Sequence, residues 1–98
     1  MGAMVVGTLS ITLHVPDSAS LKDKRQVVRS LTARLRRQFN AGVAEVGDQN
    51  LWQSAVIGVA CVSDSARHAD EMCQKILAFV DANADALVTG SRFELVHV

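Results

Sequence analysis

Apolar and polar residues alternate along residues 5–15. Every odd-numbered position there is apolar or glycine, whereas the even-numbered positions include Thr8 and Thr12. A repeat of two residues predicts a β-strand with one buried face. Pro16 and Asp17 should end this strand, because proline cannot donate to a β-ladder and aspartate favours turns.

The pattern then changes to the period of a helix. Ser20 is a suitable N-cap, with Asp23 three residues later as in a capping box, and the helix is predicted to run to about Phe39. The segment 40–42 ends in glycine and resembles a helix stop. The apolar side chains of this helix share one arc and predict its core stripe: Leu21, Val28, Leu31, Leu35 and Phe39, with Val27 at the margin.

A hairpin is predicted next. Residues 43–47 and 51–63 are both compatible with β-strands, and residues 47–50 between them are turn-forming. The segment 51–63 is long and apolar, as a central strand should be.

A second helix and a last strand complete the pattern. Ser63 or Asp64 is expected to cap the helix, which runs to about Asp81. Gly90 should break the chain and leave residues 93–98 as the final strand.

The resulting order, β-α-β-β-α-β, predicts an α+β domain with the ferredoxin-like fold. Right-handed crossovers leave few packings, and the simplest is a four-stranded antiparallel sheet with two helices on one face. The first and third strands should be central. We assign residues 4–98 to this single domain, and residues 1–3 to a cloning remnant or an alternative start.

Composition adds an uneven distribution of charge. Ten basic and ten acidic residues cancel overall, but residues 20–40 contain seven basic residues and one acidic residue. With 49% apolar residues, disorder is not expected. No signal peptide or membrane-spanning run is evident, so we expect a cytoplasmic protein without membrane association, whose Cys61 and Cys73 are free, buried thiols.

The charge surplus belongs to the first helix. Its basic side chains are expected on the side away from the core stripe, where they can contact the phosphates of a nucleic acid. A solvated surface or a protein partner remains the alternative. The candidate binding residues are Lys22, Arg25, Arg29, Arg36 and Arg37.

Three further residues are singled out. Lys24 falls within the apolar arc of the first helix, so it should either pair with Glu45 on the strand 43–47 or extend past the helix end to water. Trp52 begins the predicted central strand, and we expect it to pack at the sheet edge against the hairpin.

No catalytic, cofactor or metal site is predicted. The three histidines lack metal-ligand spacing, and the cysteines form no CxxC motif. An acylphosphatase needs glycine and arginine in the loop after the first strand, and residues 16–19 contain neither. An RNA-recognition motif needs aromatic residues on its central strands, where only Trp52 is available. The chain is therefore expected to bind rather than to catalyse.

Several spaced motifs resemble the YlxP-like family of small bacterial proteins, whose function is unknown. They are residues 20–25 (Ser-Leu-Lys-Asp-Lys-Arg), Phe39-Asn40, residues 43–47 (Val-Ala-Glu-Val-Gly) and Leu51-Trp52-Gln53. The resemblance implies a ferredoxin-like fold over the whole chain, and provides no catalytic residues to transfer. Family members are often encoded among translation-initiation and ribosome-maturation genes, which implies a role with ribosomal RNA or the ribosome. Gly42 and Asn50 depart from the serine and aspartate that are frequent in the family.

The uncovered sheet face supplies a second hypothesis. Both faces of the strand 51–63 are largely apolar, so an apolar row should be exposed beside the first strand. Such a row favours a homodimer or another protein partner, unless small residues such as Gly58 and Ala60 expose too little area. The sequence thus predicts an RNA- or ribosome-associated accessory factor, or alternatively a protein-interaction module.

Overall fold

The computed structural model describes residues 3–83 and 85–98, so Met1 and Gly2, two of the three residues left out of the predicted domain, lie outside the described residues. Six elements follow one another in the predicted order. They are β1 (Val5–His14), α1 (Leu21–Gln38), β2 (Gly42–Gly47), β3 (Ser54–Ser63), α2 (Ala66–Asp81) and β4 (Leu87–His97).

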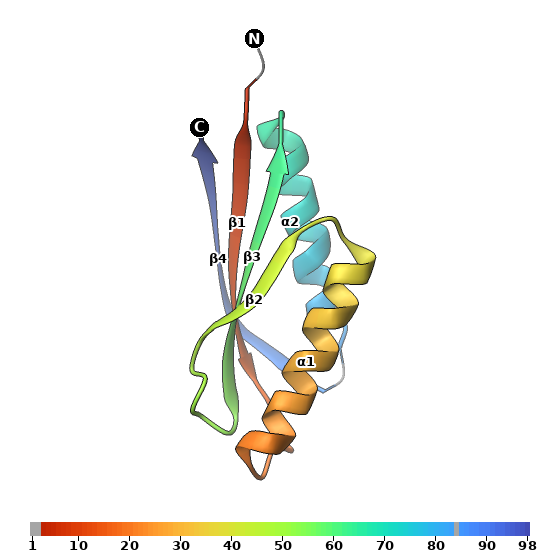
Figure 1. Ribbon diagram of the computed structural model, residues 1–98, viewed down its shortest axis with the longest axis vertical. Coiled ribbons are helices and arrows are strands. Elements are labelled where there is room, and N and C mark those ends of the chain that lie inside the picture. The colour runs from red at the N-terminus through yellow and green to blue at the C-terminus, as the bar shows by residue number, and fades with distance from the viewer. Residues whose placement is uncertain (1–2, 84) are drawn as a thin grey trace.

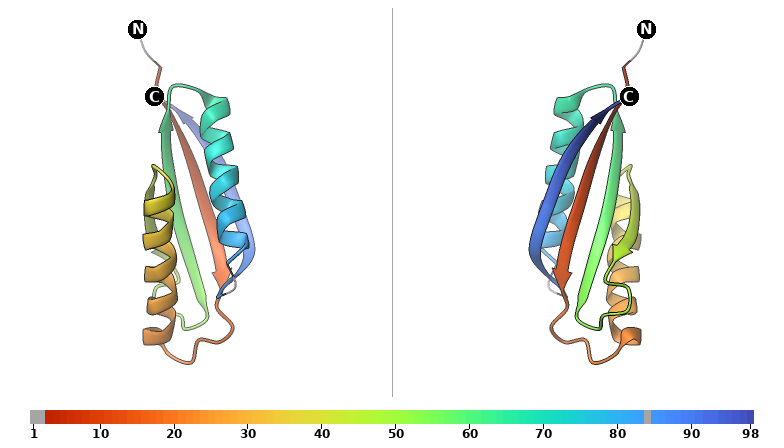
Figure 2. Two further views of the ribbon diagram at one scale, coloured as in Figure 1. Left: turned by 90° about the vertical axis from the view of Figure 1, so that its right-hand side faces the viewer. Right: turned by 90° about the vertical axis from the view of Figure 1, so that its left-hand side faces the viewer.

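The strands form one antiparallel sheet in the order β2-β3-β1-β4, with both helices on one face (Figures 1 and 2). The ferredoxin-like α+β fold and the central position of β1 and β3 are therefore confirmed. These two strands pair without interruption from Val5 opposite Ser63 to His14 opposite Ser54. In the right-hand view of Figure 2, α1 lies behind the β2 side of the sheet and α2 lies behind the β1–β4 side.

The caps explain where the helices begin. Ser20 Oγ accepts a hydrogen bond from the Asp23 N–H at 3.2 Å, and the Asp23 carboxylate accepts one from the Ala19 N–H at 3.1 Å. The cap of α2 is Ser65, not Ser63 or Asp64. Ser63 still belongs to β3, and its hydroxyl accepts from the Ser65 N–H.

The end of α1 also differs from the prediction. Phe39 caps the helix in an extended conformation, and its N–H donates to the carbonyl of Leu35. Gly42 begins β2 instead of stopping the helix. No left-handed glycine is therefore needed here, because the chain turns directly from the helix into the strand.

Two strand boundaries were predicted wrongly. β3 begins at Ser54, three residues after Leu51, because the turn continues through residues 51–53. β4 runs through Gly90, which pairs with Thr12. A register shift between Thr12 and Leu13 accommodates one extra residue in β4, and a Cβ on Gly90 would meet nothing within 4 Å. Glycine at this open edge position does not break the strand.

The core fills the space between the sheet and the two helices. Gly7 allows α2 to approach β1 closely, since a Cβ there would lie 3.2 Å from both Ala69 Cβ and Cys73 Sγ. Cys61 and Cys73 are free and buried, as predicted, with their sulfur atoms 3.9 Å apart. Among residues 3–83 and 85–98, no helix has the length and hydropathy needed to span a membrane.

Candidate nucleic-acid interface

The basic side chains of α1 lie beside its core stripe, not opposite to it. At about 100° per residue, Lys22, Arg25, Arg29 and Arg36 fall within an arc of roughly 60° that borders the stripe. We call these four residues the basic row. All four are exposed, and Arg37 is exposed farther round the helix.

Arg36 shows which way the basic row faces. Its Nη2 donates a 2.6 Å hydrogen bond to the carbonyl of Val43 on β2. β2 is an edge of the sheet, so the row follows the outer edge of the molecule, on the side where α1 lies in Figure 2. Arg36 therefore has a structural contact that the sequence did not reveal.

The rest of the basic row has no acidic partner within the part of the chain that the structure describes. The ion pairs found there are Arg67–Glu71, Arg92–Glu94 and Lys24–Glu45. Asp23, the acidic residue in the first turn of α1, is bonded to the backbone of Ala19. The row of four exposed cations therefore presents a net positive charge to solvent.

Lys24 is fully buried and paired with Glu45, and the alternative of a side chain extended to water is wrong. Its ammonium nitrogen lies 3.1 Å from Glu45 Oε2. The three ammonium protons go to three backbone carbonyls, those of Asp48 at 2.7 Å, Gln49 at 3.1 Å and Ser54 at 3.2 Å. Glu45 Oε2 consequently has a charge contact with Lys24 but no hydrogen bond.

These contacts hold the β2–β3 loop, residues 48–53, against α1. Within the loop, Asp48 takes a positive φ of 58° and its carboxylate accepts a 2.6 Å hydrogen bond from Ser54 Oγ. The loop leaves Leu51 52% exposed and Trp52 57% exposed. The prediction that Trp52 packs against the hairpin is wrong, because the residue precedes β3 instead of beginning it.

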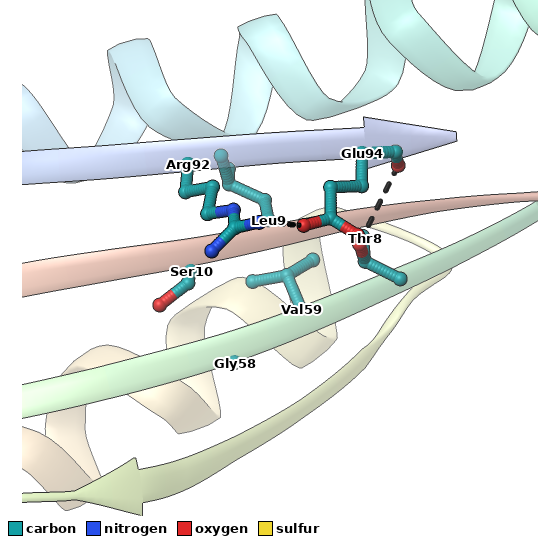
Figure 3. A pocket seen from close by; sticks show the side chains of 7 residues that line it. All are labelled: Thr8, Leu9, Ser10, Gly58, Val59, Arg92 and Glu94. Atoms are coloured by element: carbon teal, nitrogen blue, oxygen red, sulfur yellow. Dashed lines mark hydrogen bonds and ion pairs between the residues drawn. The ribbon is translucent and has the colours of Figure 1, made fainter. Parts of the chain in front are cut away.

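A shallow depression lies on the uncovered sheet face (Figure 3). It has a volume of about 240 Å³ and forms where Ser10 faces Gly58, two residues with little or no side chain. Arg92 and Glu94 at its rim pair with each other at 2.7 Å. Seven residues line it: Thr8, Leu9, Ser10, Gly58, Val59, Arg92 and Glu94. The set includes hydroxyl and carboxylate groups, but Thr8 Oγ1 donates to the backbone carbonyl of Glu94 at 3.4 Å and the Glu94 carboxylate pairs with Arg92. These contacts form no hydrogen-bonded pair of nucleophile and base among the seven residues.

One end of the same face is apolar. Val6 is paired with Val62 on one side and with Val96 on the other, so these side chains form a row across three strands. Met4 and Val98 continue the patch, and the Val98 N–H donates to the Met4 carbonyl at 2.9 Å. Val62 is 63% exposed and Val96 is 45% exposed. We call these five residues the valine end.

Histidine and acidic residues make no metal-binding group within the described ranges, where no three metal-ligating side chains come together. His14 Nδ1 instead lies 3.1 Å from the carbonyl of Gln53, which fixes the ring beside the β2–β3 loop.

Comparisons with known proteins agree with the resemblance seen in the motifs. The family model described as a protein of unknown function, DUF503, matches residues 6–93. The uncharacterised protein YlxP of Bacillus subtilis (strain 168) is 32% identical over 90 residues, which cover 92% of this chain and 98% of that protein.

Proposed function

This chain belongs to the DUF503 family of proteins of unknown function, and we propose that it is a non-enzymatic RNA-binding accessory factor that associates with the ribosome. One observation carries the proposal: the basic row of α1 has no acidic partner among the described residues. The resemblance to a family whose members are often encoded among translation-initiation and ribosome-maturation genes is consistent with this role.

The length of the basic row suits a nucleic-acid backbone. Lys22 and Arg36 are separated by 14 helical positions, which corresponds to about 21 Å at about 1.5 Å per residue. That distance covers several consecutive phosphates. Contacts to phosphates position a protein without reading bases, so we expect weak sequence preference and a steep dependence on salt.

The row also costs the isolated helix some stability. Arg25 and Arg29 are like charges four residues apart, an arrangement that destabilises a helix by about 0.2–0.5 kcal/mol. An anionic partner along the row reverses that cost by neutralising both charges. A merely solvated helix surface gains nothing from such an arrangement.

The test replaces Arg25 and Arg29 by glutamine and leaves Arg36, which bonds to Val43, in place. Both side chains are exposed, so folding should be unaffected. Binding to ribosomal RNA should weaken, and the slope of log K against log salt should become shallower by about 1.4–1.8, the contribution of two phosphate contacts.

Arg67→Gln with Lys75→Gln is the matched control, because it removes two exposed cations from α2. The control should retain the affinity and the salt slope of the wild type. The proposal would be contradicted if both double variants bound RNA with equal affinity. It would also be contradicted if both variants co-sedimented with ribosomes as much as the wild type does.

The valine end supports a second candidate function, homodimerisation or docking of a protein. Exposed apolar side chains that adjoin one another across several strands are typical of interfaces. The side chains of Val62, Val96 and Met4 satisfy this description. This candidate function uses the uncovered sheet face, so α1 could still bind another partner.

A further inference from the structure

Two large apolar side chains, Leu51 and Trp52, are exposed on a loop that is firmly held. An exposed indole on a mobile segment would need no explanation. Here, however, Lys24 donates three hydrogen bonds to backbone carbonyls at the two ends of the β2–β3 loop. The loop therefore presents Trp52 in a fixed position, which lowers the entropic cost of binding through it.

The loop is also fixed to the connection before α1. The Gln53 carbonyl accepts a hydrogen bond from the Val15 N–H at 2.9 Å, and the Gln53 amide donates to the Ser18 carbonyl at 3.3 Å. The β2–β3 loop, which contains Trp52, consequently lies at the same end of the molecule as the first turn of α1, the lower end in Figure 1. That turn and the next carry Lys22 and Arg25 of the basic row.

Several acidic residues lie at this end, among them the exposed Asp17, and one of them, Glu45, is neutralised by a cation, Lys24. The carboxylates of Asp23, Glu45 and Asp48 contact Ala19, Lys24 and Ser54 respectively. A hydrogen bond from a neutral donor leaves a carboxylate charged, so Asp23 and Asp48 offset part of the charge of Lys22 and Arg25, whereas the row as a whole, with four exposed cations, remains positive.

We propose that Trp52 stacks on an unpaired base of single-stranded RNA whose phosphates lie along the basic row. This inference rests on the proposed function and specifies its substrate class. Proteins bind single strands by combining a cationic track with aromatic side chains, and a base inside a duplex cannot reach such a platform. Leu51, beside Trp52, adds apolar contact area.

A protein partner is the competing occupant, since exposed tryptophan residues are frequent hot spots of protein interfaces. The cations of α1 favour RNA as the occupant. A tryptophan hot spot in a protein interface needs surrounding residues that exclude water, but it does not need a row of positive charges beside it. The experiment below distinguishes the two occupants.

Trp52 is the single tryptophan of the chain, so its fluorescence reports directly on the loop. We expect a single-stranded oligoadenylate to quench and shift this emission on binding, and a duplex RNA of equal length to bind without the change. Trp52→Ala should weaken oligoadenylate binding by about fivefold or more, as loss of one stacked base does, and leave duplex binding unaltered. Trp52→Phe should retain most of the affinity.

The variant Trp52→Ala should fold, because more than half of the side chain is already exposed. Leu51→Ala is the control for simple loss of apolar area, and should have a smaller effect on RNA binding. If Trp52→Ala bound oligoadenylate as tightly as the wild type, the inference would be overturned. The Leu51–Trp52 pair would then be assigned to a protein partner, and the proposed function would remain intact. Absence of binding to both RNAs would overturn the proposed function as well.

Discussion

The ammonium group of Lys24 is the most demanding buried group in the molecule. It is surrounded by three carbonyl oxygens and one carboxylate oxygen, and the side chain has no exposed surface. A buried charge is tolerated only when its hydrogen bonds and its counter-charge are provided together. Lys24 therefore connects α1, β2 and the β2–β3 loop at one point.

Replacement of Lys24 by methionine should lower the free energy of unfolding by about 2–4 kcal/mol. The change leaves Glu45 without a counter-charge and removes one donor from each of three backbone carbonyls, of which that of Asp48 still accepts from the Leu51 N–H. Because Glu45 remains 19% exposed and can recruit water, we expect a loss below that of a fully buried pair. Urea denaturation gives the measurement.

Lys75→Met provides the control for this substitution, since Lys75 is an exposed lysine on α2. Its effect should remain within about 0.5 kcal/mol. If Lys24→Met cost no more than Lys75→Met, the carbonyl contacts of Lys24 would contribute nothing to stability.

The two thiols predict a loss of stability in alkaline solution. Burial, followed by the proximity of Cys61, raises the pKa of Cys73 to about 12, and burial also raises the pKa of Cys61. An unfolded thiol loses its proton near pH 8.5. Between these values the folded chain retains the Cys73 proton that the unfolded chain loses, so stability falls as pH rises, by up to about 1.4 kcal/mol per pH unit for this thiol. The raised pKa of Cys61 acts in the same direction.

Comparison of wild type with Cys73→Ala tests this prediction, because all other titrating groups are common to both proteins. The variant should be less stable than the wild type near neutral pH. Between pH 9 and pH 11, which lie between the pKa of an unfolded thiol and that of folded Cys73, it should lose less stability than the wild type loses. Parallel stability curves for the two proteins would contradict it.

At the scale of elements, the contact between β1 and α2 depends on one glycine. Gly7→Val should lower the free energy of unfolding by about 1–3 kcal/mol, because the added atoms would force α2 away from the sheet. The nearest atoms, Ala69 Cβ and Cys73 Sγ, lie only 3.2 Å from the position of the new Cβ. Thermal or urea denaturation measures the loss.

Gly90→Val is the matched control on the edge strand β4. Nothing lies within 4 Å of the position of its Cβ, and valine has the higher strand propensity. We expect a change within about 0.5 kcal/mol in either direction. A loss at position 90 as large as that at position 7 would mean that the close approach of α2 to Gly7 does not account for the effect there.

The elements themselves follow from periodicity, which is a local property of the sequence. The alternation in β1 and the stripe of α1 identify both elements and the side that each buries, and the arc position of Lys24 places it on the core side of the helix without deciding between burial and extension to water. The start of β3 and the course of β4 depend on pairing with β1. No local pattern shows that pairing begins at Ser54 or continues through Gly90.

The candidate site, like the helices and strands, could be predicted only as far as it depends on local residue spacing. Residue spacing identified the basic helix and suggested Glu45 as the partner of Lys24. It did not reveal the bond from Arg36 to Val43 or the three carbonyls around Lys24, because both depend on backbone brought together by the tertiary fold. The exposure of Trp52 follows from the same loop conformation.

At the scale of the whole molecule, the valine end predicts self-association. Sedimentation over a wide range of protein concentrations should show a dimer that Val62→Lys and Val96→Lys convert to monomer without loss of stability. Buried lysine at an apolar interface disfavours association because its charge must be desolvated. Both positions are exposed in the single chain, so the fold should tolerate the change.

Leu87→Lys is the control for these variants, since Leu87 is 56% exposed and lies at the opposite end of β4. It should leave the dimer unaffected. A wild-type protein that sediments as a monomer at every concentration would remove the homodimer as the occupant of the valine end.

The position of β4 has a consequence for amide hydrogen exchange. β1 is bonded to β3 on one side and to β4 on the other, so its N–H groups should exchange slowly along its length. In an edge strand, alternate N–H groups have no partner strand, so fast and slow exchange should alternate along β4. A molecule that adds a strand to β4 would slow the exchange of the fast-exchanging N–H groups of β4 alone. A molecule that binds α1 would leave the alternation of fast and slow exchange along β4 unchanged.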